Sequence, residues 1–195
     1  RGYRRIALAG FSLGGNVVLR YLGEHGPDLS PQIKAAVTVS VPVDLPPAVK
    51  ALHNWQNFLY MKNFVLDLNK KVKAKEQLLK ENNFSTIYPK RLIDFDEQYT
   101  APVHGFKDAT DYYQRASSLP LIPNIRIPTL LINAGDDSFL TPTCFPIKLA
   151  EKLPLFYLEV PRWGGHVGFG DLRKGETLWS EQRMFSFLTD KINTG

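Results

Sequence analysis

The sequence lacks several features that identify common protein classes. Its 195 residues include a single cysteine, Cys144, so the chain has no disulfide framework of the kind that stabilises small secreted domains. No run approaches the roughly 18 consecutive apolar residues that a membrane-spanning helix needs. Glycine and proline each occur only 14 times, which excludes a collagen-like or disordered chain. With 44% hydrophobic residues, the sequence can instead form the core of one ordinary domain.

Charge is unevenly distributed along the chain. The whole excess of +5 falls within residues 61–91, which contain eight basic and three acidic residues. The lysines of residues 70–80 are not interleaved with the aromatic side chains that a nucleic-acid site uses for stacking. We therefore expect a solvated helix face and no nucleic-acid partner. Contact with an anionic surface, such as a membrane surface, is the alternative.

Short apolar runs alternate with helical patterns over much of the chain. These runs are rich in β-branched residues and end at Gly or Pro, which is typical of strands buried on both faces of a sheet. Strands that alternate with helices predict an α/β fold with a mostly parallel sheet and flanking helices. The expected strands cover residues 6–9, 33–41, 127–134 and 155–160, and the expected flanking helices cover residues 17–22 and 176–192.

The alternation is interrupted between the second and third expected strands. The interval is too long for an ordinary crossover, and its pattern is mainly helical. We predict an α/β core formed by residues 1–43 and 127–195, with a helical cap inserted at residues 44–126. The expected cap helices cover residues 46–59, 68–81 and 95–113.

A serine follows the first expected strand, in the sequence Gly10-Phe11-Ser12-Leu13-Gly14. This G-x-S-x-G pattern is typical of a sharp strand-to-helix turn that needs small flanking residues and holds the serine exposed. The backbone N–H of Leu13 would then point at a developing oxyanion, aided by the helix N-terminus. The pattern predicts Ser12 as a nucleophile. The plainer interpretation is a glycine-rich turn with a solvent-facing serine, and a phosphate-binding loop is disfavoured because no lysine follows the glycines.

A serine nucleophile needs a general base. Among the four histidines, only His166 directly follows a strand end, and sites in such folds form at the carboxyl edge of the sheet. We predict His166 as the general base and acid, and structural roles for His25, His53 and His104.

Two adjacent carboxylates, Asp136 and Asp137, follow the third expected strand and are candidates for the acid that orients the base. Adjacent side chains point in different directions, so one should face His166 and the other a turn amide. We favour Asp137, because it precedes the segment that leaves the strand. Asp136 is the second candidate, or a turn carboxylate.

Metal binding is the competing use of histidine and carboxylate side chains. His104, Asp108 and Asp111 have the spacing of one helix face, but no second histidine joins them. We expect no metal site, and a serine mechanism requires no cofactor.

These residues together resemble the α/β-hydrolase superfamily, specifically its YheT-like branch, over nearly the whole chain. The order Ser12, Asp137, His166 is the order of that superfamily. By position, the resemblance implies that these three residues are nucleophile, acid and base. Ser138 departs from the branch, which usually has proline there. The segments that carry the resemblance are residues 10–16 (GFSLGGN), 95–96 (FD), 100–106 (TAPVHGF), 111–113 (DYY), Ser117, 128–137 (PTLLINAGDD) and 164–169 (GGHVGF).

The resemblance also implies that further strands precede the serine turn in a complete fold. In this superfamily the turn follows the fifth strand of an eight-stranded sheet, whereas eleven residues precede Ser12 here. We therefore expect an incomplete α/β-hydrolase fold, the C-terminal half, without the loop that gives a second oxyanion donor and with little activity. The strand at residues 3–9 would be an unpaired apolar edge, so we expect either a homodimer through this edge or a compromised fold.

The expected function is hydrolysis of a small-molecule carboxylic ester through an acyl-serine intermediate, and eukaryotic relatives of the branch are linked to phospholipids. A thioesterase, amidase or acyltransferase would use the same triad, and a non-catalytic binding module is the alternative of another class. The lone cysteine and the lack of a visible leader favour a cytoplasmic location. Cap aromatics should cover the cleft and select an apolar acyl group, or else pack as the cap's core: Trp55, Phe58, Tyr60, Phe64, Phe95, Phe106, Tyr112 and Tyr113.

Overall fold

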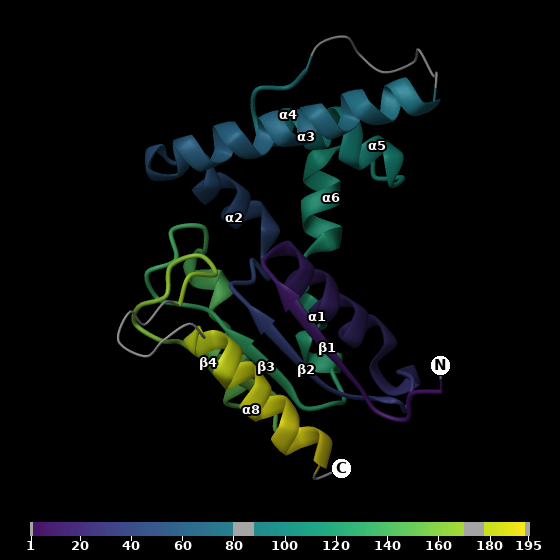
Figure 1. The fold of residues 1–195 in the computed structure, drawn as a ribbon, viewed down its shortest axis with the longest axis vertical. Coiled ribbons are helices and arrows are strands. Elements are labelled where there is room, and N and C mark those ends of the chain that lie inside the picture. Colours follow the sequence, from purple (N-terminus) through teal and green to yellow (C-terminus); the bar gives the residue numbers. More distant parts are fainter. Residues whose placement is uncertain (1, 80–87, 170–177, 194–195) are drawn as a thin grey trace.

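The computed structural model describes residues 2–79, 88–169 and 178–193. At its centre is a parallel sheet of four strands in the order β1-β2-β3-β4 (Figure 1). The predicted α/β class with a parallel sheet is therefore confirmed. The strands are β1 (Ile6–Phe11), β2 (Ile33–Val39), β3 (Thr129–Ile132) and β4 (Phe156–Glu159).

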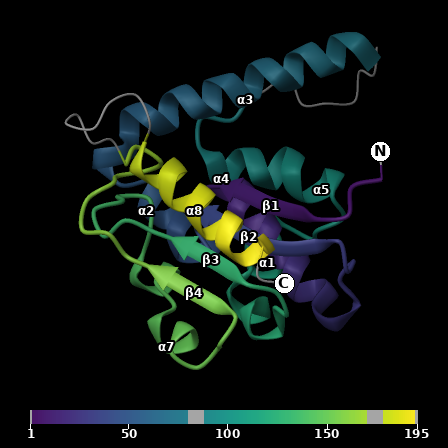
Figure 2. The ribbon, with the colours of Figure 1, turned by 60° about the horizontal axis from the view of Figure 1, so that its bottom comes forward.

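Helices cover both faces of this sheet. Side chains alternate between the two faces along each strand, so neighbouring residues belong to different hydrophobic clusters. Ala36 and Leu131 pack in the cluster that holds Leu19 and Leu22 of α1 (Leu13–His25). Val37, Val39, Leu130 and Ile132 pack with Met184 and Phe187 of α8 (Trp179–Asn193). In Figure 2, α8 lies in front of the strands and α1 behind them, which gives three layers.

Between β2 and β3 the chain forms a series of helices, most of which lie above the sheet in Figure 1, whereas the last packs beside α1. The division into a core and an inserted cap stays a prediction. These elements are α2 (Leu45–Leu52), η2 (Trp55–Asn57), α3 (Phe58–Leu79), α4 (Leu92–Phe95), the π-helical η3 (Asp96–Thr100), α5 (Ala101–Val103), α6 (Ala109–Ala116) and η4 (Leu119–Asn124).

The expected continuous helix across residues 46–59 is wrong. The chain leaves the helical path at Asn54, which has extended backbone angles, and the Asn57 side chain donates a hydrogen bond to the carbonyl of Ala51. Trp55, one of the cap aromatics expected over the cleft or in the cap's core, is 83% exposed, and Leu59 is 74% exposed.

The charged helix expected from residue 68 is the second half of α3, which is one helix from Phe58 to Leu79. Its expected end at Glu81, and the expected start of the last helix at Glu176, lie outside the described residues. None of the helices that the structure describes combines the length and apolar character needed to cross a bilayer. The shorter elements are η1 (Gly26–Asp28), η5 (Pro142–Cys144) and α7 (Ile147–Ala150).

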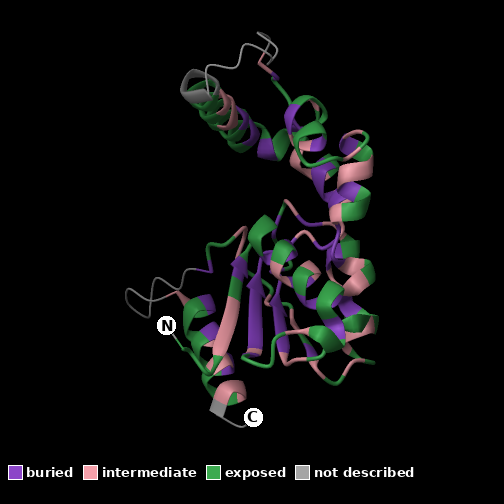
Figure 3. Cartoon of the chain, turned by 90° about the vertical axis from the view of Figure 1, so that its right-hand side faces the viewer, coloured by how far each residue is buried: buried purple, intermediate pink, exposed green. Residues whose placement is uncertain are grey.

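β1 forms one edge of the sheet. It pairs with β2 and, among the described residues, with no other strand. Residues of β1 are mostly part-buried or exposed, whereas β3 is buried throughout, and Figure 3 shows this difference between edge and centre. A second copy could add a strand here, so the homodimer stays a prediction.

Candidate active site

Ser12 occupies the sharp turn between β1 and α1. Its backbone has φ 50° and ψ −126°, a conformation that L-residues rarely adopt. The turn is held from both sides, because the Ser12 N–H donates to the carbonyl of Val39 at 2.9 Å and the Ser12 carbonyl accepts from Gly15 N–H at 3.0 Å. Such over-determined backbone strain is characteristic of functional positions.

Two glycines allow this turn to close. A Cβ at Gly10 would lie 2.7 Å from the carbonyl oxygen of Gly14, and a Cβ at Gly15 would collide with the side chain of Val41. A Cβ at Gly14 would meet nothing within 4 Å. The steric requirement therefore falls on Gly10 and Gly15, whereas the sequence pattern had indicated Gly10 and Gly14.

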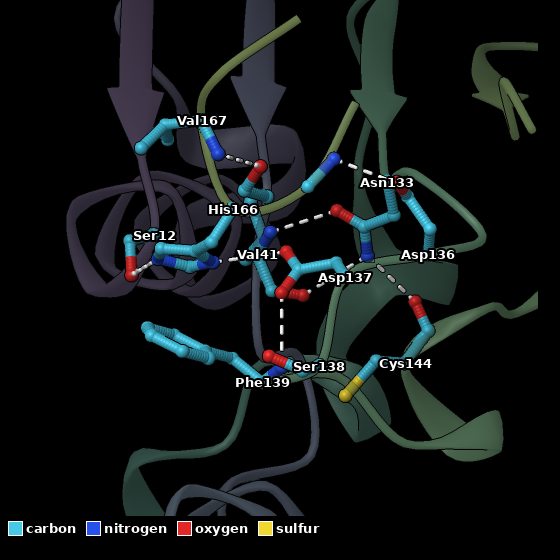
Figure 4. Close-up of polar contacts among 12 residues, drawn as sticks. Ser12, Val41, Asn133, Asp136, Asp137, Ser138, Phe139, Cys144, His166 and Val167 are labelled. Atoms are coloured by element: carbon cyan, nitrogen blue, oxygen red, sulfur yellow. Dashed lines mark hydrogen bonds and ion pairs between the residues drawn. The ribbon is translucent and has the colours of Figure 1, made fainter. Parts of the chain in front are cut away.

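The structure brings Ser12, His166 and Asp137 together in one chain of hydrogen bonds (Figure 4). Nε2 of His166 lies 3.0 Å from Oγ of Ser12, and Nδ1 lies 2.9 Å from Oδ2 of Asp137. The Asp137 side chain is completely buried and that of His166 nearly so. Ser12 and His166 are 154 positions apart along the chain, and Asp137 and His166 are 29 positions apart. All three lie close together at the carboxyl edge of the sheet.

The two adjacent carboxylates have different partners. Oδ1 of Asp137 accepts the backbone N–H of Phe139 at 2.9 Å, which leaves Oδ2 directed at His166. Oδ1 of Asp136 instead accepts the backbone N–H of Gly165 at 2.8 Å. Asp137 thus contacts the imidazole, while Asp136 fixes the backbone next to it.

The backbone around His166 is anchored on both sides. Besides the bond from Gly165 to Asp136, the Val167 N–H donates to Oγ of Ser40 at 3.0 Å. Ser40 directly follows β2 and has φ 54°. Sequence reasoning missed Ser40, because one serine at a strand end resembles an ordinary turn residue.

Asn133 is a second residue that sequence reasoning missed. Its buried amide accepts the N–H of Val41 at 2.7 Å and donates to the carbonyls of Val41 at 3.0 Å and Cys144 at 2.8 Å. The Asn133 side chain therefore links the ends of β2 and β3 to Cys144, which follows the two aspartates along the chain. The sequence feature that could have identified Asn133 is its polar amide within the apolar run of the third expected strand.

The loop that carries Asp137 also contacts the helical segment above it. The Phe139 ring lies 4.2 Å from the His166 ring, centroid to centroid. Ser138 Oγ donates to Oδ1 of Asn57 at 2.7 Å, and Nδ2 of Asn57 donates back to the Ser138 carbonyl at 3.1 Å. Ser138, the departure from the branch pattern, thereby fixes this loop to η2.

A cavity of about 610 Å³ lies between the triad residues and the helices. Ser12, Leu13 and His166 line one side. As the first residue of α1, Leu13 has no carbonyl four positions earlier in the helix to accept its N–H. Five of the eight predicted cap aromatics line the cavity, whereas Trp55, Phe58 and Phe106 do not: the five are Tyr60, Phe64, Phe95, Tyr112 and Tyr113.

One region of the cavity wall is polar. Asp96 accepts hydrogen bonds from Thr100 Oγ1 and from the hydroxyl of Tyr113, each at 2.6 Å. Burial raises the pKa of Asp96, and the two hydrogen bonds act in the opposite direction. Burial, together with the bond to Asp96, also raises the pKa of Tyr113. The contacts join η3 to α6 and give an otherwise apolar cavity one anionic or hydrogen-bonding position.

The other histidines and the candidate metal residues lie outside the chain of hydrogen bonds that joins Ser12, His166 and Asp137. His25 packs against Tyr21 with ring centroids 4.4 Å apart, and Nδ1 of His53 donates to the Val49 carbonyl at 2.7 Å. His104 lines the cavity. Asp108 caps α6 by accepting the N–H of Asp111. Across residues 2–79, 88–169 and 178–193, no three His, Cys, Asp or Glu side chains cluster as a metal would require.

Comparison with known proteins gives consistent matches. Residues 2–171 match the family model described as alpha/beta hydrolase fold. The chain is 34% identical to YheT of Escherichia coli (strain K12) over 96% of its own length and 56% of that protein's. It is 32% identical to medium-chain fatty acid ethyl ester synthase/esterase 2 of Saccharomyces cerevisiae over 95% of its own length and 46% of that protein's. It is 30% identical to phospholipase ABHD3 of Homo sapiens, with coverage of 91% and 42%. The chain thus spans about half the length of the curated relatives it matches.

Solved structures show the same fold. An acylaminoacyl peptidase of Pyrococcus horikoshii matches with a TM-score of 0.55 at 16% identity, over 99% of this chain and 25% of that one. The Pyrococcus furiosus esterase Pf2001 matches with a TM-score of 0.52 at 19% identity, over 96% of this chain and 54% of that one.

Proposed function

The chain belongs to the α/β-hydrolase fold family, and we propose that it is a serine hydrolase that cleaves carboxylic esters through an acyl-enzyme on Ser12. The observation that carries this proposal is the continuous hydrogen-bond chain from Ser12 Oγ through His166 to buried Asp137. A nucleophile within reach of a base, itself oriented by a third group, is the arrangement that activates serine.

In acylation, Nε2 of His166 accepts the Ser12 hydroxyl proton as Oγ attacks the ester carbonyl carbon. The carbonyl oxygen becomes an oxyanion, and the backbone N–H of Leu13 at the start of α1 is placed to stabilise it. When the C–O bond to the leaving group breaks, the imidazolium returns its proton to the departing alcohol. Ser12 then carries the acyl group.

Deacylation repeats these steps with water. His166 removes a proton from water, the hydroxide adds to the acyl carbon, and the proton returns to Oγ as the acid leaves. Asp137 remains ionised throughout. It holds Nδ1 protonated, so that Nε2 is free to act as the base, and it stabilises the imidazolium that forms in each half-reaction.

The lining of the cavity supports one substrate class. Its walls are mainly aliphatic and aromatic apart from the triad, His104 and the Asp96 region, so an apolar acyl chain fits it better than a charged acid. The names of relatives point the same way, since they include a medium-chain fatty acid ethyl ester synthase/esterase and phospholipases. We propose a small-molecule ester with an apolar acyl group, bound under the helices of residues 45–124, which act as a cap.

A series of p-nitrophenyl esters from acetate to decanoate tests this substrate class. Each methylene buried in the cavity should raise kcat/KM by about fourfold, the equivalent of about 0.8 kcal/mol, until the cavity is full. Phe64→Ala removes one cavity wall and should reduce kcat/KM for decanoate while sparing acetate. Steady-state kinetics with each ester measures both effects.

Phe185→Ala is the matched control, because Phe185 is an exposed aromatic residue on α8 that does not line the cavity. This variant should reproduce the wild-type series. A kcat/KM that is flat or falls with chain length in the wild-type protein would contradict an apolar acyl pocket.

A further inference from the structure

α3 has an inner face that belongs to the cap and the cavity. Met61 and Val65 are buried in a cluster with Leu92 of α4. Tyr60 and Phe64 line the cavity that contains Ser12. The buried contacts of α3 are therefore made by one side of the helix. Phe58, Lys62 and Leu66 line the rim of a second cavity of about 560 Å³ that α3 forms with residues 88–92, and they are exposed there.

The outer face carries a regular stripe of leucine and lysine. Leu59, Lys62, Leu66, Lys70 and Lys73 follow one another at intervals of three or four residues, which places all five on one side of the helix. All five are exposed. Leu59 and Leu66 expose 74% and 48% of their surface, and they share one face of the helix instead of being scattered over it.

The amino end of α3 extends this apolar surface. Trp55 of η2 is 83% exposed, and Phe58, the first residue of α3, is 61% exposed. Figure 1 shows α3 at the outer boundary of the molecule, on the side away from the sheet. We call Trp55, Phe58, Leu59, Lys62, Leu66, Lys70 and Lys73 the outer α3 surface.

The charge of α3 is strongly positive. Lys62, Lys70, Lys71, Lys73 and Lys75 are exposed along the helix, and Asp67 is the one acidic residue among the α3 side chains that the structure describes. Asp67 bonds Lys70 at 2.9 Å. Of these lysines, Lys62, Lys70 and Lys73 lie on the same face as the exposed apolar groups, so a complementary partner would present negative charge next to an apolar phase.

We propose that the outer α3 surface docks the protein on the surface of an anionic lipid bilayer. Aromatic and leucine side chains beside a polar face rich in lysine are the combination that inserts a helix shallowly into the interface, while the lysines stay at the headgroups. A helix face that only contacts water is typically polar, whereas this face exposes the side chains of Trp55, Leu59 and Leu66. The helix spans roughly 33 Å at 1.5 Å per residue, long enough for all these groups to meet one surface.

The same helix would then link the membrane to the cavity. Its outer face meets lipid, and its inner face, one helix diameter away, forms the wall that faces Ser12 and His166. Docking therefore brings the cavity close to lipid-borne substrates. Vesicle binding itself is independent of the proposed ester hydrolysis, because it is measured without substrate and in the Ser12→Ala protein as well.

Vesicle co-sedimentation tests the proposal. The protein should bind phosphatidylcholine vesicles containing 30% phosphatidylserine at least tenfold more tightly than pure phosphatidylcholine vesicles, and 0.5 M NaCl should weaken the binding. Replacing Lys62, Lys70 and Lys73 together by Gln should weaken vesicle binding about 100-fold, because each lysine near an anionic surface contributes a factor of about five in affinity. Leu59→Ser with Leu66→Ser should weaken it about tenfold with unchanged circular dichroism.

α7 supplies the matched control. Ile147 and Lys148 of α7, and Lys152 two residues after it, are exposed. Figure 2 shows α7 at the opposite end of the molecule from α3. The combination Ile147→Ser, Lys148→Gln and Lys152→Gln should leave vesicle binding unchanged. Equal binding to both vesicle types, or a loss of binding only in the α7 variant, would overturn the proposal. So would a concentration-dependent dimer that Leu59→Ser abolishes, because a second copy would then occupy the surface.

Discussion

The Ser12→Ala protein is expected to lose about 10⁵- to 10⁶-fold in kcat for ester hydrolysis, with little change in KM. The loss is this large because the triad residues act as one unit, and the remaining groups only bind substrate and stabilise the oxyanion. In the folded chain no other hydroxyl lies within hydrogen-bond distance of His166 Nε2 among the described residues. Steady-state hydrolysis of the preferred p-nitrophenyl ester measures the effect.

Ser138→Ala is the control for this experiment. Ser138 is a serine of the same active-site region, but its hydroxyl bonds Asn57 rather than His166. We expect this variant to retain kcat within tenfold of the wild-type value, with at most a modest loss of stability. If Ser12→Ala were as active as Ser138→Ala, the nucleophile would have to be a different residue.

The second large effect distinguishes the two adjacent carboxylates. Asp137→Asn should lower kcat by about 10⁴-fold, because an amide facing Nδ1 no longer favours the required tautomer or stabilises the imidazolium. Asp136→Asn should lower kcat less than tenfold, because an amide oxygen can still accept the N–H of Gly165. Both substitutions replace aspartate by asparagine, at neighbouring positions. A difference in kcat between the two variants therefore reflects the position of the carboxylate and not the kind of substitution.

Both variants should be measured for kcat, KM and thermal unfolding. Equal unfolding midpoints would show that the difference in kcat does not come from folding. A larger loss of kcat in Asp136→Asn than in Asp137→Asn would reverse the assignment of the acid.

Much of the site could be predicted because its residues follow strand ends. Ser12 directly follows β1, and Asp137 and His166 lie in the loops that follow β3 and β4. Parallel strands bring their carboxyl ends to one edge of the sheet. The choice of Asp137 over Asp136 rested on local chain direction. In the structure Asp137 contacts His166 and Asp136 contacts the backbone of Gly165, and the assignment of Asp137 as the acid stays a prediction.

The supporting residues could not be predicted in this way. Ser40 contacts a residue 127 positions later, and Asn133 joins three segments. Their partners are set by the packing of the whole sheet edge, and no local pattern encodes such contacts. The pair Asp96 and Tyr113 is similar, since their spacing of 17 residues has meaning only once η3 and α6 are packed together.

The helical segment shows the limit of periodicity. Trp55 and Leu59 follow Leu52 at intervals of three and four residues, as in one continuous helix, but the chain turns at Asn54 and both side chains are exposed. No glycine or proline marks this break, and the bond from Asn57 to Ala51 that stabilises it is itself a side-chain contact. The same break gives the outer α3 surface its exposed aromatic end.

The most direct test of the account is mass spectrometry of the protein after reaction with a fluorophosphonate probe. We predict a single phosphonyl adduct per chain, mapped to the peptide that contains Ser12, absent from Ser12→Ala and formed far more slowly in His166→Ala. An unmodified wild-type protein, or an adduct on another residue such as Ser40 or Ser138, would contradict the assignment of Ser12 as an activated nucleophile.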